Sequence, residues 1–125
     1  MRTNPPYFIT FEGIDTCGKT TQLKLAAAYL VQHNIPHVVE KEPGSTALGG
    51  TLRRILKEPS AVYKTMNAVF EGNPDFTHLD IHQQRTSEAE LFLFVAARAD
   101  FLHHVVVPQK KQGKSVLSDL FHDST

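Results

Sequence analysis

The sequence predicts an α/β fold in which short parallel strands alternate with helices. Three observations support it: a β-rich segment at residues 7–11 that runs into a glycine-rich loop, a second strand-like segment at residues 36–40, and helical periodicity after each of them. Strand, helix, strand, helix in this order favours a parallel sheet. The 125 residues, of which 41% are apolar, suit one domain with one core.

The first two helices are predicted from apolar residues that recur on one face. The first helix begins at Lys19 and ends near Asn34, and its apolar positions are Leu23, Ala27, Leu30 and Val31. A turn at residues 43–45 then leads into the second helix, whose apolar positions are Leu48, Leu52, Ile55 and Leu56. Both helices therefore have one side suited to covering a sheet.

The second half of the chain is predicted to hold a long helix and a third strand. Residues 58–85 lose the periodicity and read as an insertion or long loop, with a short helix around residues 62–70. Acidic residues after Ser87 mark a helix start, and the apolar pattern continues through Val106, which is too long for one strand. Gly113 ends this helix, and residues 115–119 form the third strand.

Charge and cysteine content narrow the function classes. Thirteen basic residues balance thirteen acidic ones, so no overall field favours a nucleic-acid or membrane partner, and a small-molecule partner is expected. Cys17 is the only cysteine, which excludes an intramolecular disulfide. The N-terminal residues contain no apolar signal-peptide core, so we expect a cytoplasmic protein.

A phosphate-binding loop follows the first predicted strand. The pattern of a glycine, four residues and then Gly-Lys-Thr is complete, and it lies between a strand and a helix as the mechanism requires. Backbone N–H groups would face phosphate oxygens, Lys19 would add positive charge near the β and γ phosphates, and the Thr20 hydroxyl would ligate Mg²⁺. We therefore predict ATP and Mg²⁺ as cofactors. The predicted nucleotide-binding residues are Gly13, Ile14, Asp15, Thr16, Cys17, Gly18, Lys19 and Thr20, and Lys19 is also a predicted catalytic residue.

A phosphate loop alone does not separate kinases from GTPases, so other segments must decide. No Asp-x-x-Gly follows the loop, and no Asn-Lys-x-Asp is present. Four segments in order resemble the N-terminal motifs of bacterial thymidylate kinases: FEGIDTCGKTTQ, KEPGSTALGGTLRRIL, LFLFVAARAD and SVLSDLFHDST. This resemblance implies a three-layer P-loop kinase fold with a parallel sheet and transfer of a phosphoryl group from Mg-ATP to dTMP, giving dTDP and ADP. It also implies a homodimer when the protein is full length.

The resemblance implies roles for three further residues. Asp15 matches a loop carboxylate near the 3′-hydroxyl of the acceptor nucleotide, with catalytic and substrate-binding roles, and a carboxylate suits a hydroxyl donor. Arg53 matches an arginine that grips the acceptor phosphate bidentately. Glu42 is the candidate active-site carboxylate of the Lys41-Glu42 turn. Without the resemblance, Asp15 reads as a turn residue, Arg53 as a surface arginine and Glu42 as part of a charged surface turn.

Phe94 and Arg98 are four residues apart and share a helix face. By resemblance they supply the ring that stacks on thymine and the donor that meets a thymine carbonyl. A flat apolar surface and one donor suit a pyrimidine. Core packing is the alternative for Phe94, and a surface ion pair is the alternative for Arg98.

Two features depart from the family pattern. Asp119 ends the third strand as the predicted catalytic carboxylate and magnesium ligand, but Leu120 follows where the family has an arginine. Removing a positioned cation from a phosphoryl-transfer site slows the reaction, so we expect an impaired enzyme. We also expect residues 1–125 to be part of the kinase domain, with the C-terminal strands and the lid missing. The rival readings are a kinase for another nucleoside or nucleotide, and a non-catalytic nucleotide-binding remnant.

Overall fold

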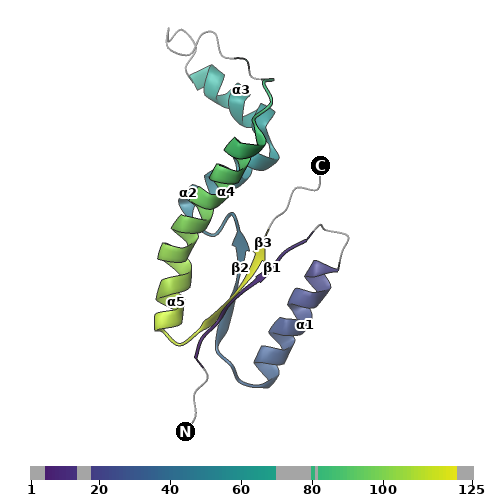
Figure 1. The fold of residues 1–125 in the computed structure, drawn as a ribbon, viewed down its shortest axis with the longest axis vertical. Helices are drawn as coiled ribbons and strands as arrows, with labels where there is room; N and C mark the ends of the chain where they lie inside the picture. Colours follow the sequence, from purple (N-terminus) through teal and green to yellow (C-terminus); the bar gives the residue numbers. More distant parts are fainter. Residues whose placement is uncertain (1–4, 14–17, 70–79, 81, 121–125) are drawn as a thin grey trace.

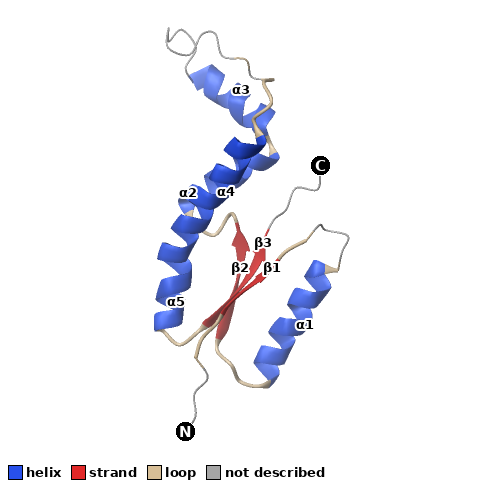
Figure 2. Cartoon of the chain, in the orientation of Figure 1, coloured by secondary structure: helices blue, strands red, loops and turns tan. Residues whose placement is uncertain are grey.

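The computed structural model describes residues 5–13, 18–69, 80 and 82–120 (Figure 1). Three parallel strands form a sheet with helices on both sides (Figure 2). In chain order the elements are β1 (Phe8–Phe11), α1 (Lys19–Gln32), β2 (His37–Glu42), α2 (Ala47–Lys57), α3 (Pro59–Val69), α4 (Ser87–Phe101), the π-helical turn η1 (Leu102–Val106), α5 (Val107–Lys111) and β3 (Ser115–Leu120). The predicted parallel α/β fold is confirmed.

The strand order is β1-β3-β2, so the last strand in sequence lies in the middle of the sheet. Phe11 of β1 is aligned with Asp119 of β3, and Glu42 of β2 is aligned with Leu120. Val116, Leu117 and Ser118 are fully buried, as expected for a central strand covered on both faces. The sequence predicted a parallel sheet, and the structure adds the strand order.

Local signals explain where the helices begin. Gly18 precedes α1 with a φ of 85°, a backbone conformation that glycine adopts without steric cost. The hydroxyls of Thr46 and Thr86 accept hydrogen bonds from backbone N–H groups in the first turns of α2 and α4, at 2.9 and 3.1 Å. Glu88 and Glu90 then place negative charge in the first turn of α4.

The core lies between the sheet and the long helix formed by α4, η1 and α5. Phe101 and Val106 pack with Val116 of the central strand, and Phe8 and Val38 border this cluster. α1 covers the opposite face of the sheet (Figure 2). The three-layer arrangement thus leaves the ends of the strands as the place where loops from both faces meet.

The continuous helix Ser87–Lys111 has 25 residues and a mean hydropathy of 1.4, so by length and composition it could cross a membrane. It is the one such helix among the described residues. Within it Phe101 and Val106 belong to the core, whereas Leu91, Phe92 and Val95 are exposed, so the fold accounts for part of its apolar character.

Two segments differ in detail from the sequence prediction. The expected short helix around residues 62–70 is α3, which begins at Pro59; residue 70 lies outside the described residues. α3 lies at the far end of α4, away from the sheet (Figure 1). The predicted long helix also contains the turn η1, which ends two residues before Pro108. Proline has no N–H to donate to the carbonyl one turn earlier, so the regular α-helical bonding is interrupted here.

Candidate functional site at the carboxyl ends of the strands

The carboxyl ends of all three strands meet at one edge of the sheet. β1 leads into the glycine loop after Phe11, β2 ends at Glu42, and β3 ends at Asp119 and Leu120. Ligands of open α/β sheets bind at this edge, because loops and helix N-termini converge there. The candidate site is therefore built from the segments that follow the strands.

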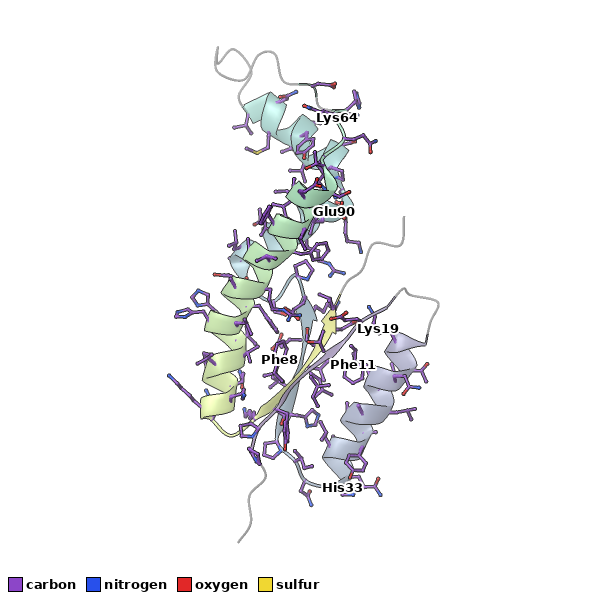
Figure 3. All side chains as sticks on the ribbon, viewed as in Figure 1. Phe8, Phe11, Lys19, His33, Lys64 and Glu90 are labelled. Carbon is purple, nitrogen blue, oxygen red and sulfur yellow. The ribbon has the colours of Figure 1, made fainter. Side chains whose placement is uncertain are left out.

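Lys19 connects the glycine loop with the central strand. Its side chain is 6% exposed, its Nζ donates a hydrogen bond to the backbone carbonyl of Leu120 at 2.9 Å, and it lies 2.8 Å from Asp119 Oδ1. Figure 3 shows Lys19 at the end of the sheet where α1 begins. Two of the predicted catalytic residues, Lys19 and Asp119, are thus in contact.

Asp119 keeps capacity for a further ligand. Its Oδ1 is buried, and within the described part of the chain it has the nearby Lys19 ammonium but no hydrogen bond of good alignment. Thr20, the other predicted magnesium ligand, is exposed in the first turn of α1. Carboxylate and hydroxyl oxygens are the donors that Mg²⁺ prefers, so the two side chains fit this metal chemically. Gly13 and Gly18 flank the loop, whereas the predicted Ile14, Asp15, Thr16 and Cys17 lie outside the described residues.

Glu42 forms the centre of a buried polar cluster. The residue is 2% exposed, and its carboxylate accepts hydrogen bonds from Arg98 Nε, from Arg98 Nη2 at 2.8 Å and from the hydroxyl of Ser118. The Arg98 guanidinium also lies 5.2 Å from the centre of the Phe8 ring, within the range of a cation–π contact. Glu42 is therefore not part of a charged surface turn. Arg98 is ion paired, but its partner is buried.

Arg53 of α2 lies against the turn that follows β2. Its Nη1 donates a hydrogen bond to the carbonyl of Pro43 at 3.0 Å. The turn also packs closely on the start of α2. A Cβ at Gly49 would lie 3.0 Å from Thr46 Oγ1 and 3.2 Å from the backbone nitrogen of Gly44, so a larger residue at this position would displace the turn. Arg54, its neighbour, is exposed and lies 3.4 Å from Glu58. The two adjacent arginines therefore have different surroundings.

Phe94 lies one turn before Arg98 on α4 and is half-buried. The other two phenylalanines of α4 differ from Phe94 in burial: Phe92 is exposed and Phe101 is in the core. The core position on this helix is thus taken by Phe101, and Phe94 retains an accessible surface.

Sequence reasoning missed three contributors to this edge. Ser118 holds the Glu42 carboxylate, Phe8 lies beside the Arg98 guanidinium, and the carbonyl of Leu120 accepts a hydrogen bond from Lys19. The signal for Ser118 was a hydroxyl directly after the apolar pair Val116-Leu117 in a strand, since a buried hydroxyl needs a partner. A backbone carbonyl and an aromatic neighbour leave no comparable signal in a sequence.

A cavity of about 420 Å³ lies elsewhere, between α3 and the start of α4. Tyr63, Met66 and Thr86 are among the residues that line it. None of the predicted site residues in the described part of the chain lines this cavity. It is therefore separate from the edge of the sheet.

Comparison with known proteins gives one consistent family. The thymidylate kinase family model matches residues 11–73. The thymidylate kinase of Syntrophus aciditrophicus is 43% identical over 119 residues, which are 95% of this chain and 45% of that protein. The thymidylate kinase of Carboxydothermus hydrogenoformans is 37% identical over 118 residues, which are 94% of this chain and 47% of that protein.

A solved structure agrees with these relatives. The crystal structure of thymidylate kinase from Ehrlichia chaffeensis matches with a TM-score of 0.65 and 32% identity, covering 94% of this chain and 55% of that one. The chain thus spans about half the length of the proteins it matches. The family match includes both the glycine loop that precedes Lys19 and helix α2 with Arg53, so the chain belongs to the thymidylate kinase family.

Proposed function

We propose that the protein transfers the γ-phosphoryl group of Mg-ATP to dTMP, giving dTDP and ADP. The proposal is supported by the contacts of Lys19, Arg53 and Arg98, each of which bonds to the end of a strand or to the turn after it, in a chain that belongs to the thymidylate kinase family. Fold alone would not license this step, because the same fold serves many reactions. The proposal therefore depends on the individual side chains.

On the donor side, Lys19 and the N-terminus of α1 would bind the phosphates of ATP. The Lys19 ammonium is now compensated by Asp119 at 2.8 Å, so a bound triphosphate would compete with this carboxylate for the ammonium. Asp119 would then be free to hold the metal together with Thr20. When bound, Mg²⁺ supplies neutralising charge at the phosphate oxygens.

On the acceptor side, Arg53 would bind the phosphate of dTMP and Phe94 would stack on its base. Arg53 is already oriented by the carbonyl of Pro43 at 3.0 Å, which lowers the entropic cost of engaging a phosphate. Glu42 is surrounded by Arg98 and Ser118, so we assign it a supporting place at the acceptor site rather than a contact with substrate. Asp15 keeps its proposed position near the sugar hydroxyl.

Because Leu120 stands where the family pattern has an arginine, the proposed site has one positively charged side chain fewer. Leu120 ends β3 directly after Asp119 and contributes its backbone carbonyl, not a charge, to Lys19. Catalysis of phosphoryl transfer rests mostly on positioning and charge stabilisation, so we propose that turnover is slow.

The test measures dTDP formation from ATP and dTMP by chromatography. We expect slow formation that Lys19→Ala abolishes and that Lys24→Ala preserves; Lys24 is an exposed lysine of the same helix. A panel of other nucleoside monophosphates separates dTMP kinase from a kinase with another acceptor. ATP binding without transfer to any acceptor would instead indicate a nucleotide-binding remnant.

We further propose that the protein is cytoplasmic, binds no nucleic acid or membrane and forms a homodimer. Support for self-association comes from α4, which exposes Leu91, Phe92 and Val95 with 60%, 68% and 53% of their surfaces accessible. Sedimentation of the chain with Phe92→Glu beside the parent tests this, since a charge on a buried interface should produce the monomer. An unchanged sedimentation coefficient would exclude this face as the interface.

A further inference from the structure

Arg98 is held by one edge of its guanidinium group. Nε and Nη2 both donate to the Glu42 carboxylate, which is a bidentate pair. Such a pair fixes the plane of the guanidinium as well as its distance from the carboxylate. Both N–H groups of Nη1 remain, and the described part of the chain offers them no hydrogen-bond acceptor. The free edge of Arg98 therefore has a defined direction.

The carboxylate that holds Arg98 is itself held. Ser118 lies in the central strand, is fully buried and donates its hydroxyl to Glu42 Oε2. Glu42 lies in β2 and Ser118 in β3. The two strands are paired, so the sheet fixes the positions of both residues. Arg98 reaches this pair from α4, and its side chain is 35% exposed while that of Glu42 is 3% exposed. The cluster is thus buried at the carboxylate and accessible at the guanidinium.

We propose that Glu42, oriented by Ser118, is a positioning residue that sets acceptor specificity through Arg98. This inference rests on the proposed function. The free N–H groups of Nη1 would meet the carbonyl oxygen at ring position 4, where thymine has an acceptor and cytosine has an amino donor. A donor in a fixed position favours binding of thymine through its carbonyl. With cytosine, the N–H groups of Arg98 and the amino group of the base would be two donors facing each other. A freely rotating arginine would turn away from the amino group and discriminate less.

Glu42→Gln tests the proposal because it keeps the shape and removes one acceptor. The substitution replaces one carboxylate oxygen by an NH2 donor, so only one of the two parallel hydrogen bonds to Arg98 Nε and Nη2 keeps its acceptor atom and the bidentate pair is lost. Calorimetry on the chain should show the ratio of dTMP to dCMP affinity falling by about tenfold, with ATP affinity unchanged. Glu40→Gln is the matched control on the same strand and should leave the ratio unchanged. Ser118→Ala should lower the ratio in the same direction by a smaller factor.

A double-variant comparison separates positioning from general stability. In an Arg98→Met background, Glu42→Gln should not change the affinity ratio further, because the arginine it positions is absent. If Glu42→Gln weakened dTMP and dCMP equally, or acted as strongly without Arg98, the residue would be structural and the proposal wrong.

Failure of the proposed function gives a different result. In that case the unaltered chain binds no dTMP, whereas the contact itself is still measurable from the Arg98 Nε–H signal in nitrogen-15 NMR. Slow exchange of this proton in the parent, lost in Glu42→Gln, supports the fixed orientation. Fast exchange in the parent overturns it.

Discussion

Replacing Arg98 by methionine should destabilise the fold much more than replacing an ordinary surface arginine. The Glu42 residue is 2% exposed and receives two hydrogen bonds from Arg98 and one from Ser118. Without Arg98 the buried carboxylate keeps only the hydroxyl. Removing one partner of a buried ion pair costs about 3–5 kcal/mol, because the other charge stays buried and uncompensated.

The position of Arg98 reduces this estimate. Its side chain is 35% exposed, so water can reach the space that the guanidinium leaves and solvate part of the carboxylate. We therefore expect a loss of about 2–3 kcal/mol. For a domain of this length, that loss corresponds to a decrease in Tm of roughly 10 °C. Replacing both partners, Arg98→Met with Glu42→Gln, should recover most of the loss, because no buried charge remains.

Urea denaturation and thermal circular dichroism measure these differences. Arg54→Met is the matched control, since Arg54 pairs with Glu58 at 3.4 Å and both side chains are more than half exposed. Exposed pairs contribute about 0–1 kcal/mol, so this variant should unfold nearly as the parent does. Equal losses for Arg98→Met and Arg54→Met, or a double variant no more stable than Arg98→Met, would refute the reasoning.

Three further predictions concern the proposed site. Lys19→Ala should weaken ATP binding by about tenfold or more, while Lys24→Ala should not, and equal calorimetric affinities for the two variants would remove Lys19 from the donor side. Phe94→Ala should weaken dTMP binding by about 1–3 kcal/mol and leave ATP binding unchanged, with the exposed Val107→Ala as control; unaltered dTMP affinity in a less stable protein would make Phe94 a core residue. Leu120→Arg should raise kcat for dTMP phosphorylation by about a hundredfold with little effect on ATP affinity in steady-state assays, and equal turnover would show that Leu120 is tolerated.

Local sequence signals were sufficient for the elements that position the donor side. The strand before Gly13 and the helix after Gly18 follow from composition and periodicity, and both are present as β1 and α1. The third strand at residues 115–119 was also predicted, because Gly113 ends the helix before it. These signals are local, so tertiary packing did not have to be known.

The acceptor side could not be predicted to the same depth. Arg98 and Glu42 are 56 residues apart, and their contact depends on the strand order and on the angle of α4, which no local pattern encodes. The same holds for the central place of β3, since periodicity predicts a strand but not its neighbours. The sequence therefore predicted residue types at this edge, whereas the structure was needed for the partners.

The turn η1 allows the two halves of the long helix to be aligned independently. Phe101 and Val106 are both buried although they are five positions apart. In a regular α-helix five residues would advance the side-chain direction by about 500°, leaving these two roughly 140° apart. The wider turn absorbs one extra residue and returns Val106 to the side of Phe101. A deletion of one residue within η1 would thus be compatible with an uninterrupted helix that still anchors in the core. Because Arg98 lies in α4, before η1, such a change in length would not alter the direction in which Arg98 reaches Glu42.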